Sequence, residues 1–187
     1  MNTEGLFSKI DALPGTGGGR NIIIAVDGRC ASGKTTFSGS LHEKYDCNVF
    51  HMDDFFLRPG QRTAERLSKP GGNVDYERFL SEILLPLYED REVVYQRYDC
   101  FSKCLLPPLH VEKKRLNIVE GVYSLHPELF DYYDMTVFLD ISEEEQRKRI
   151  LKRNSPLMAE KFFTEWIPLE ERYFKDLQIR EKAGFII

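Results

Sequence analysis

The chain has 187 residues, a length typical of one domain that can bury a sizeable core. Its 42% hydrophobic and 30% charged residues are those of a soluble globular protein. A net charge of -4 disfavours non-specific nucleic-acid binding, which needs a strong basic excess, although a local basic cluster remains compatible with it.

The sequence carries no segment typical of membrane insertion or secretion. The longest apolar stretch, 22–26, is too short to span a bilayer, and the N-terminus lacks the basic start and apolar middle of a signal peptide. The four cysteines form no CxxC pair and are expected to be reduced thiols. These features predict a cytoplasmic protein with neither a membrane nor a nucleic-acid partner, and they leave a homo-oligomer open.

The apolar pattern predicts strands that alternate with helices. After an amphipathic helix at 3–13 and a glycine-rich connector at 14–19, strands are expected at 21–27, 47–52, 92–99, 115–121, 135–140 and 183–187. Helices are expected at 35–44, 76–88, 143–154 and 159–178, the last disturbed at Pro168, with a loop around a helical turn at 57–75. This alternation favours a single α/β domain over 1–187, with a mostly parallel sheet covered by helices on both faces.

Residues 28–35, GRCASGKT, match the phosphate-loop pattern GxxxxGK[ST] between an apolar strand and a helix. The glycines allow successive backbone N–H groups to point at phosphate oxygens, and the helix adds its positive end. Lys34 can reach the β and γ phosphates, and the Thr35 hydroxyl can ligate Mg²⁺. The pattern predicts a site for a nucleoside triphosphate, ATP, made by Gly28, Ala31, Ser32, Gly33, Lys34, Thr35 and Thr36.

Two adjacent carboxylates, Asp53 and Asp54, end the strand that follows the phosphate loop. Ligands gather at the carboxyl ends of strands in such sheets, so at least one acid is expected to face the γ-phosphate. There it could accept a proton from an attacking hydroxyl or help hold Mg²⁺; the alternative is a helix cap or a solvated turn. Glu120 occupies the matching place on another strand, where it could bind Mg²⁺ through water or merely end the strand.

Six motifs follow one another from about residue 20 to the C-terminus: GRCASGKT, HMDDFF, GGNVDYERF, YD, VEG and a basic helix. This order resembles that of the uridine kinase and phosphoribulokinase group of P-loop kinases. The resemblance implies a three-layer P-loop NTPase-type sandwich with a helical lid, at about 143–165 in this chain.

The resemblance also implies roles for individual residues. The family's catalytic aspartate lies in a D-x-F-[YF] turn, which implies that Asp53 is the general base. Residues 73–75, NVD, resemble an N-F-D element whose aspartate holds ribose hydroxyls in this family, which implies that Asp75 binds the acceptor. Tyr98 resembles a tyrosine that lies near the general base. Arginines of the basic lid helix approach the transferring phosphate in this family, which implies that role for Arg149 and Arg153.

Helix geometry independently favours the two lid arginines. Arg149 and Arg153 are four residues apart and share one helix face, where they could neutralise charge together with Lys34. The alternative is a surface helix with ion pairs such as Glu145–Arg149. Residues 154–160 could form the mobile tip of a lid that closes to exclude water.

The acceptor side departs from the uridine kinase pattern. Lys103 falls where those enzymes carry a histidine that reads the pyrimidine; it could instead be a solvated loop lysine. A basic stretch with Arg58, Arg62, Arg66 and Lys69 could hold an anionic acceptor or form a solvated turn. The candidate substrate-binding residues are Asp75, Tyr98, Lys103 and Arg58.

Together these observations predict an ATP-dependent kinase that transfers the γ-phosphoryl group of Mg·ATP to a hydroxyl of a small molecule, in first place a nucleoside. Two readings stay open beside it. The acceptor could already be phosphorylated or acidic, such as a nucleoside monophosphate or a sugar phosphate. The chain could also be a nucleotide-binding regulator, which the absence of a guanine-reading N/T-K-x-D motif disfavours.

Overall fold

The computed structural model describes residues 3–12 and 20–187. The predicted N-terminal helix is present as α1 (Thr3–Ala12), whereas the predicted connector at 14–19 lies outside the described residues. None of the helices in the described ranges has the length and apolar character needed to cross a bilayer.

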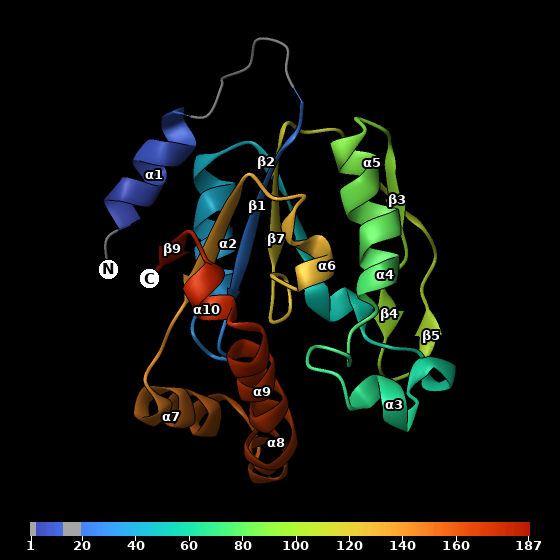
Figure 1. Cartoon of the computed structure of the whole chain (residues 1–187), viewed down its shortest axis with the longest axis vertical. Coiled ribbons are helices and arrows are strands. Elements are labelled where there is room, and N and C mark those ends of the chain that lie inside the picture. Colours follow the sequence, from blue (N-terminus) through green and yellow to red (C-terminus); the bar gives the residue numbers. More distant parts are fainter. Residues whose placement is uncertain (1–2, 13–19) are drawn as a thin grey trace.

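A five-stranded sheet forms the centre of the molecule, in the order β2-β7-β1-β8-β9 with all four pairings parallel (Figure 1). The strands are β1 (Ile22–Gly28), β2 (Cys47–His51), β7 (Leu116–Glu120), β8 (Met135–Leu139) and β9 (Phe185–Ile186). The central strands are almost continuously apolar because both of their faces are buried. Glu120 is the register partner of both Val26 and His51, so β1, β2 and β7 end at the same edge.

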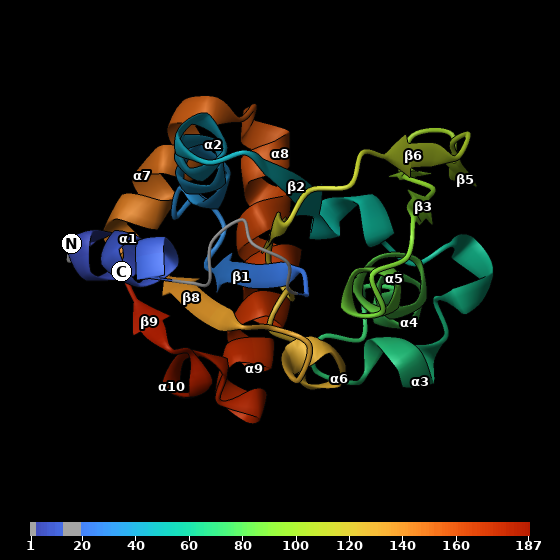
Figure 2. The ribbon, with the colours of Figure 1, turned by 90° about the horizontal axis from the view of Figure 1, so that it is seen from above.

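Helices cover both faces of the sheet. On one face, α1 and α2 (Lys34–Lys44) pack Leu6 and Leu41 against Ile24 of β1. On the other, Phe79 and Phe174 belong to the core around β1 that also includes α6 (Pro127–Phe130) and α10 (Ile179–Lys182). Figure 2 shows α1 and α2 on the side of the sheet opposite α6 and α10. The predicted three-layer α/β fold is confirmed.

Two long helical runs contain a π-helical segment that ends two residues before a proline. The run at 76–88 consists of α4 (Tyr76–Phe79), the segment Leu80–Leu84 and α5 (Leu85–Tyr88), with Pro86 in its first turn. The segment Phe162–Trp166 likewise precedes α9 (Ile167–Leu177), with Pro168 in its first turn. Because proline has no N–H to donate to the preceding turn, the hydrogen-bond ladder widens there, as the disturbance predicted at Pro168 required.

The predicted strand at 92–99 does not join the main sheet. Its residues split into β3 (Val93–Tyr95) and β4 (Tyr98–Asp99), which pair antiparallel with β6 (Leu109–Val111) and β5 (Cys104–Leu105). The segment at 57–75, predicted as a loop around a helical turn, contains the turn Pro59–Gln61 and α3 (Ala64–Leu67). A further short helical turn, Met52–Phe55, precedes it and was not predicted.

Below the carboxyl edge of the sheet in Figure 1 lie α7 (Glu143–Arg153), α8 (Pro156–Lys161) and the beginning of α9. Ser142 and Ser155 cap α7 and α8 with their side-chain oxygens. Ile150 of α7 and Ala159 of α8 pack against Cys30 of the phosphate loop. The region predicted as a lid therefore contacts the loop that is expected to hold phosphate.

Candidate active site

A cavity of about 1190 Å³ lies between the carboxyl edge of the sheet, the β4–β5 hairpin and the helices α7 to α9. Most of the residues that the sequence singled out line it: Ala31, Gly33, Lys34, Thr35, Thr36, Asp53, Tyr98, Lys103, Glu120, Arg149 and Arg153. Gly28, Ser32, Arg58 and Asp75 do not reach its wall. Two elements far apart in sequence, 28–36 and 149–153, thus face the same space.

The phosphate loop has the backbone shape that its glycines predict. Gly28 and Gly33 have φ angles of +138° and +105°, which residues with a Cβ rarely adopt. A Cβ on Gly28 would lie 2.1 Å from the Leu139 carbonyl oxygen, so the strand β8 passes too close for any larger residue. Lys34 is 8% exposed, and its ammonium donates to the carbonyl oxygens of Gly28 at 2.7 Å and Arg29 at 2.9 Å. These contacts hold the lysine across the loop.

A buried acid that the sequence analysis did not single out supports this loop from below. Asp27, the residue before Gly28, accepts hydrogen bonds from the Gly28 N–H at 2.7 Å and the Leu125 N–H at 2.9 Å. The Tyr173 hydroxyl of α9 donates to the same carboxylate at 2.9 Å. Burial raises the pKa of Asp27 to about 6 despite these donors. The one available signal was an acid at the end of an otherwise apolar run.

A second buried acid, Glu170 of α9, holds the loop from the side of the lid. Its Oε2 accepts from the Cys30 N–H at 3.0 Å, and Gln146 of α7 donates to the Cys30 carbonyl oxygen at 3.1 Å. Glu170 is 6% exposed, and burial raises its pKa to about 7. Burial also raises the pKa of the Cys30 thiol to about 12, so this cysteine is held as a neutral packing group.

The acids at the ends of β2 and β7 share one electrostatic environment. Asp53 is exposed to the cavity, and desolvation by the surrounding protein raises its pKa, as does the negative charge of Glu120. Lys34, His51 and Arg153 oppose this rise through their positive charge, and Lys34 and Arg153 line the same cavity as Asp53. His51 Nδ1 lies 2.5 Å from Glu120 Oε1, and this hydrogen bond raises the pKa of the histidine.

The cavity offers oxygen donors of the kind that Mg²⁺ prefers. The Thr35 hydroxyl, in the first turn of α2, and the Glu120 carboxylate, at the carboxyl end of β7, both line it. Residues 3–12 and 20–187 contain no group of three or more His, Cys, Asp or Glu side chains that could hold a metal by themselves. Mg²⁺ commonly takes one or two protein oxygens and completes its shell with water and phosphate, so this donor set fits it.

Helix α7 forms the predicted surface ion pair and also contacts the phosphate loop. Arg149 donates from Nε to Glu145 Oε1 at 2.9 Å, the predicted surface pair, and from Nη1 to the Ala31 carbonyl oxygen at 3.2 Å. Arg153 lies over the Phe162 ring, 5.4 Å from its centroid, and forms no ion pair with any residue that the structure describes. Both guanidinium groups border the cavity beside the phosphate loop.

Two of the predicted acceptor residues lie behind the cavity wall. Asp75, 2% exposed, accepts from the Arg78 N–H at 3.2 Å and thereby caps α4, and Gln61 donates to its other oxygen at 2.8 Å. Arg58 donates from Nε to the Gln61 side-chain oxygen at 3.0 Å. In this conformation both side chains are engaged within the 58–78 segment.

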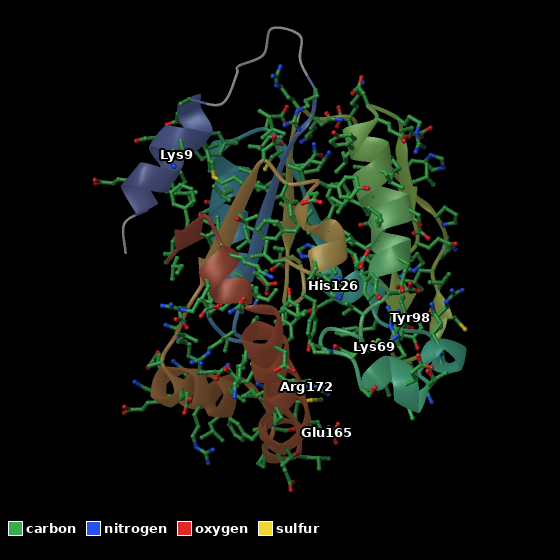
Figure 3. The ribbon with its side chains drawn as sticks, in the orientation of Figure 1. Lys9, Lys69, Tyr98, His126, Glu165 and Arg172 are labelled. Atoms are coloured by element: carbon green, nitrogen blue, oxygen red, sulfur yellow. The ribbon has the colours of Figure 1, made fainter. Side chains whose placement is uncertain are left out.

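The other two predicted acceptor residues, Tyr98 and Lys103, do line the cavity from the β4–β5 hairpin. Figure 3 shows Tyr98 on the side of α3 and α4, and Glu165 on the side of α8 and α9. The structure adds cavity-lining residues that the sequence analysis left out of its candidate site, notably Arg62, Asn73, Lys152, Glu165 and Trp166.

A glycine-rich loop between β1 and α2, at the carboxyl edge of a parallel sheet and beside the helices α7 to α9, is the arrangement of P-loop kinase folds. No family model matches the chain. Solved structures match it over nearly its whole length. A protein from Bacillus stearothermophilus described as a possible uridine kinase has 18% identity and a TM-score of 0.71, covering 98% of this chain and 96% of its own.

Two further solved structures have a similar fold. A candidate fructose transport system kinase from Silicibacter sp. TM1040 has 19% identity and a TM-score of 0.75, covering 100% of this chain and 99% of its own. D-glycerate 3-kinase from Cryptococcus neoformans var. grubii has 14% identity and a TM-score of 0.64, covering 90% and 84%. The fold implied by the order of motifs is therefore confirmed, and these three kinases of differently named substrates share it.

Proposed function

We propose that this protein is an ATP-dependent kinase that transfers the γ-phosphoryl group to a hydroxyl of a small molecule. One observation carries the proposal: the carboxylate of Asp53 lines the same cavity as the Lys34 of the phosphate loop and is influenced by its charge. A nucleotide held by the loop would direct its terminal phosphate towards a basic group on the facing strand.

In the proposed reaction, Asp53 accepts the proton of the acceptor hydroxyl while the hydroxyl oxygen forms a bond to the γ-phosphorus. The bond between that phosphorus and the bridging oxygen of ADP breaks, and ADP leaves. A raised pKa brings the Asp53 carboxylate closer to neutral pH, which makes it a more effective base. Lys34, Arg149 and Arg153 would neutralise the charge that develops on the phosphoryl oxygens.

Magnesium would be held by the Thr35 hydroxyl and Glu120, and when bound it supplies positive charge at the β and γ phosphates. The hydrogen bond from His51 fixes one oxygen of Glu120 and leaves the other available. The order of motifs suggests a nucleoside as acceptor, with Tyr98 on the acceptor side of the cavity.

The test measures ADP release by a coupled assay, with and without added acceptors. The acceptors are nucleosides, nucleotides, sugar phosphates and hydroxy acids. Replacing Asp53 with asparagine should lower kcat by roughly two to four powers of ten, the usual scale of general base catalysis, and leave the Kd of ATP within a few-fold. The neighbouring Asp54→Asn is the matched control, since Asp54 does not line the cavity.

Undiminished turnover in Asp53→Asn would remove this residue from the mechanism. ADP release that is equal with and without every acceptor would contradict the kinase and favour a hydrolytic switch or regulator.

A further inference from the structure

The acceptor side of the cavity carries two cationic side chains, Arg62 after the Pro59–Gln61 turn and Lys103 in the β4–β5 hairpin. Neither side chain donates a hydrogen bond or forms an ion pair with any residue in the described ranges 3–12 and 20–187. Because neither cation is bonded to a carboxylate of the described residues, although Asp53 and Glu165 line the same cavity, an anionic ligand that contacts both would be favoured.

The other basic side chains of the segment 58–78 differ from Arg62 because they have bonding partners. Each of the other basic side chains at 58–78 is held by an acidic or amide partner: Arg58 by Gln61, Arg66 by Glu77, Lys69 by Glu65 and Arg78 by Glu82. None of these four lines the cavity. The fold therefore separates the basic stretch into paired cations that stabilise the segment and one unpaired cation, Arg62, that faces the ligand space.

The charges of Arg62 and of the proposed base both influence the pKa of the Cys100 thiol. After burial and the charge of Asp99, the negative charge of Asp53 raises the pKa of the Cys100 thiol, and the positive charge of Arg62 lowers it. Asp53 and Arg62 thus both act on this one cavity-lining side chain. Lys103 follows Cys100 by three residues in the same hairpin, where its φ of +57° is uncommon for a lysine.

The cations that would serve ATP form a separate group. Arg149 donates a hydrogen bond to the Ala31 carbonyl oxygen of the phosphate loop. Arg153 follows about one helical turn later on α7. Arg62 follows the Pro59–Gln61 turn and Lys103 lies between β4 and β5, so neither belongs to the phosphate loop or to the helices α7 to α9. A triphosphate bound at 28–36 would leave their charges uncompensated.

We propose that the acceptor carries an anionic group, a carboxylate or a phosphate monoester, which Arg62 and Lys103 bind while its hydroxyl faces Asp53. This inference rests on the proposed kinase function. A guanidinium offers two parallel donors that match the oxygens of either anion, and the lysine adds a compact charge. The anion itself is unchanged in the reaction, since only the hydroxyl oxygen forms the new bond to phosphorus.

The experiment compares acceptors that differ only in charge: glycerol with glycerate and glycerol 3-phosphate, ribose with ribonate and ribose 5-phosphate, and uridine with uridine monophosphate. Two readouts are used, acceptor-dependent ADP release and calorimetric binding with the phosphate loop filled by Mg²⁺ and a non-hydrolysable ATP analogue. In at least one series, the anionic member should have a KM or Kd at least about ten-fold below that of its neutral partner. Comparing the carboxylate compound with the phosphate compound of the same series identifies which anion the site prefers.

Arg62→Gln and Lys103→Gln should each raise the Kd of the preferred anionic compound by about ten- to a hundred-fold, the scale of one charge-assisted hydrogen bond, and leave the Kd of ATP within two-fold. Arg62→Lys should recover part of the loss because it restores the charge without the paired donors. Arg91→Gln is the matched control, because Arg91 pairs with Glu89 and lines a different hollow.

The proposal would be overturned if neutral and anionic members of every series gave equal ADP release and equal binding, including none. Unchanged affinity for the anionic compound in both Arg62→Gln and Lys103→Gln would also overturn it. Acceptor-dependent ADP release that prefers neutral compounds would overturn the anion site and leave the kinase standing. Charge-selective binding without acceptor-dependent ADP release would support the anion site and refute the kinase.

Discussion

Replacing Glu170 with glutamine should change how the stability of the fold depends on pH. The buried carboxylate accepts a hydrogen bond from the Cys30 N–H at 3.0 Å, and a glutamine oxygen can accept the same bond. The substitution therefore removes the ionisation and retains the contact. Because Glu170 is 6% exposed, solvent screens its charge little.

The size of the effect follows from the pKa. Burial raises the pKa of Glu170 from 4.5 to about 7, so folding favours the protonated form. As pH rises from 4.5 to 7 the unfolded chain ionises first, and the free energy of unfolding falls across this window. At about 1.4 kcal/mol per pKa unit, the free energy of unfolding falls, relative to its value well below pH 4.5, by about 1 kcal/mol at pH 5 and by about 3 kcal/mol at pH 8.

Glu170→Gln should therefore exceed the wild type in stability by about 3 kcal/mol at pH 8 and by about 1 kcal/mol at pH 5. Urea denaturation followed by far-ultraviolet circular dichroism at both pH values measures the difference. Asp27, whose pKa of about 6 falls in the same window, interacts electrostatically with Glu170, so the comparison removes only the part of its titration that does not depend on Glu170. A difference that is constant with pH, or that shrinks as pH rises, would refute the assignment of this raised pKa to Glu170.

Three further substitutions test the support of the phosphate loop. Gly28→Ala should lower Tm by about 10 °C, because its Cβ would lie 2.1 Å from the Leu139 carbonyl oxygen at a φ of +138°; an unchanged melting curve would contradict the close approach of β8. Tyr173→Phe should cost about 1–3 kcal/mol of unfolding free energy, measured in urea, since its hydroxyl donates to the buried Asp27 carboxylate, and a cost near zero would argue against that bond. Lys34→Met should weaken ATP binding at least about ten-fold in calorimetry with little change in Tm, whereas retained affinity would separate Lys34 from the phosphates.

The sequence predicted the phosphate side of the cavity well because its determinants are local. A strand, a glycine-rich loop and a helix follow one another within 22–44, and each step is fixed by neighbouring residues. The acid at the end of β2 was equally accessible, since Asp53 directly follows an apolar strand. Both predictions needed only the rule that parallel strands end at one edge.

The acceptor side was harder to predict because long-range contacts decide which side chains are free. Asp75 precedes an amphipathic helical run, and the N-cap that it forms is a local signature that could have been recognised. By contrast, no local pattern distinguishes the paired Arg58 from the unpaired Arg62 four residues later. Glu170 was also missed, because its partner Cys30 lies 140 residues earlier in the chain.

The π-helical segment before Pro168 has a practical consequence. Trp166, the single tryptophan of the sequence, lies in this segment with its ring edge-on to Phe162, 4.5 Å between centroids, and borders the cavity at 37% exposure. Indole fluorescence responds to polarity, so its emission should shift whenever the space beside it fills or the surrounding helices rearrange. The chain thus contains an intrinsic optical reporter, and equilibrium titrations or stopped-flow traces can be recorded on the unlabelled protein.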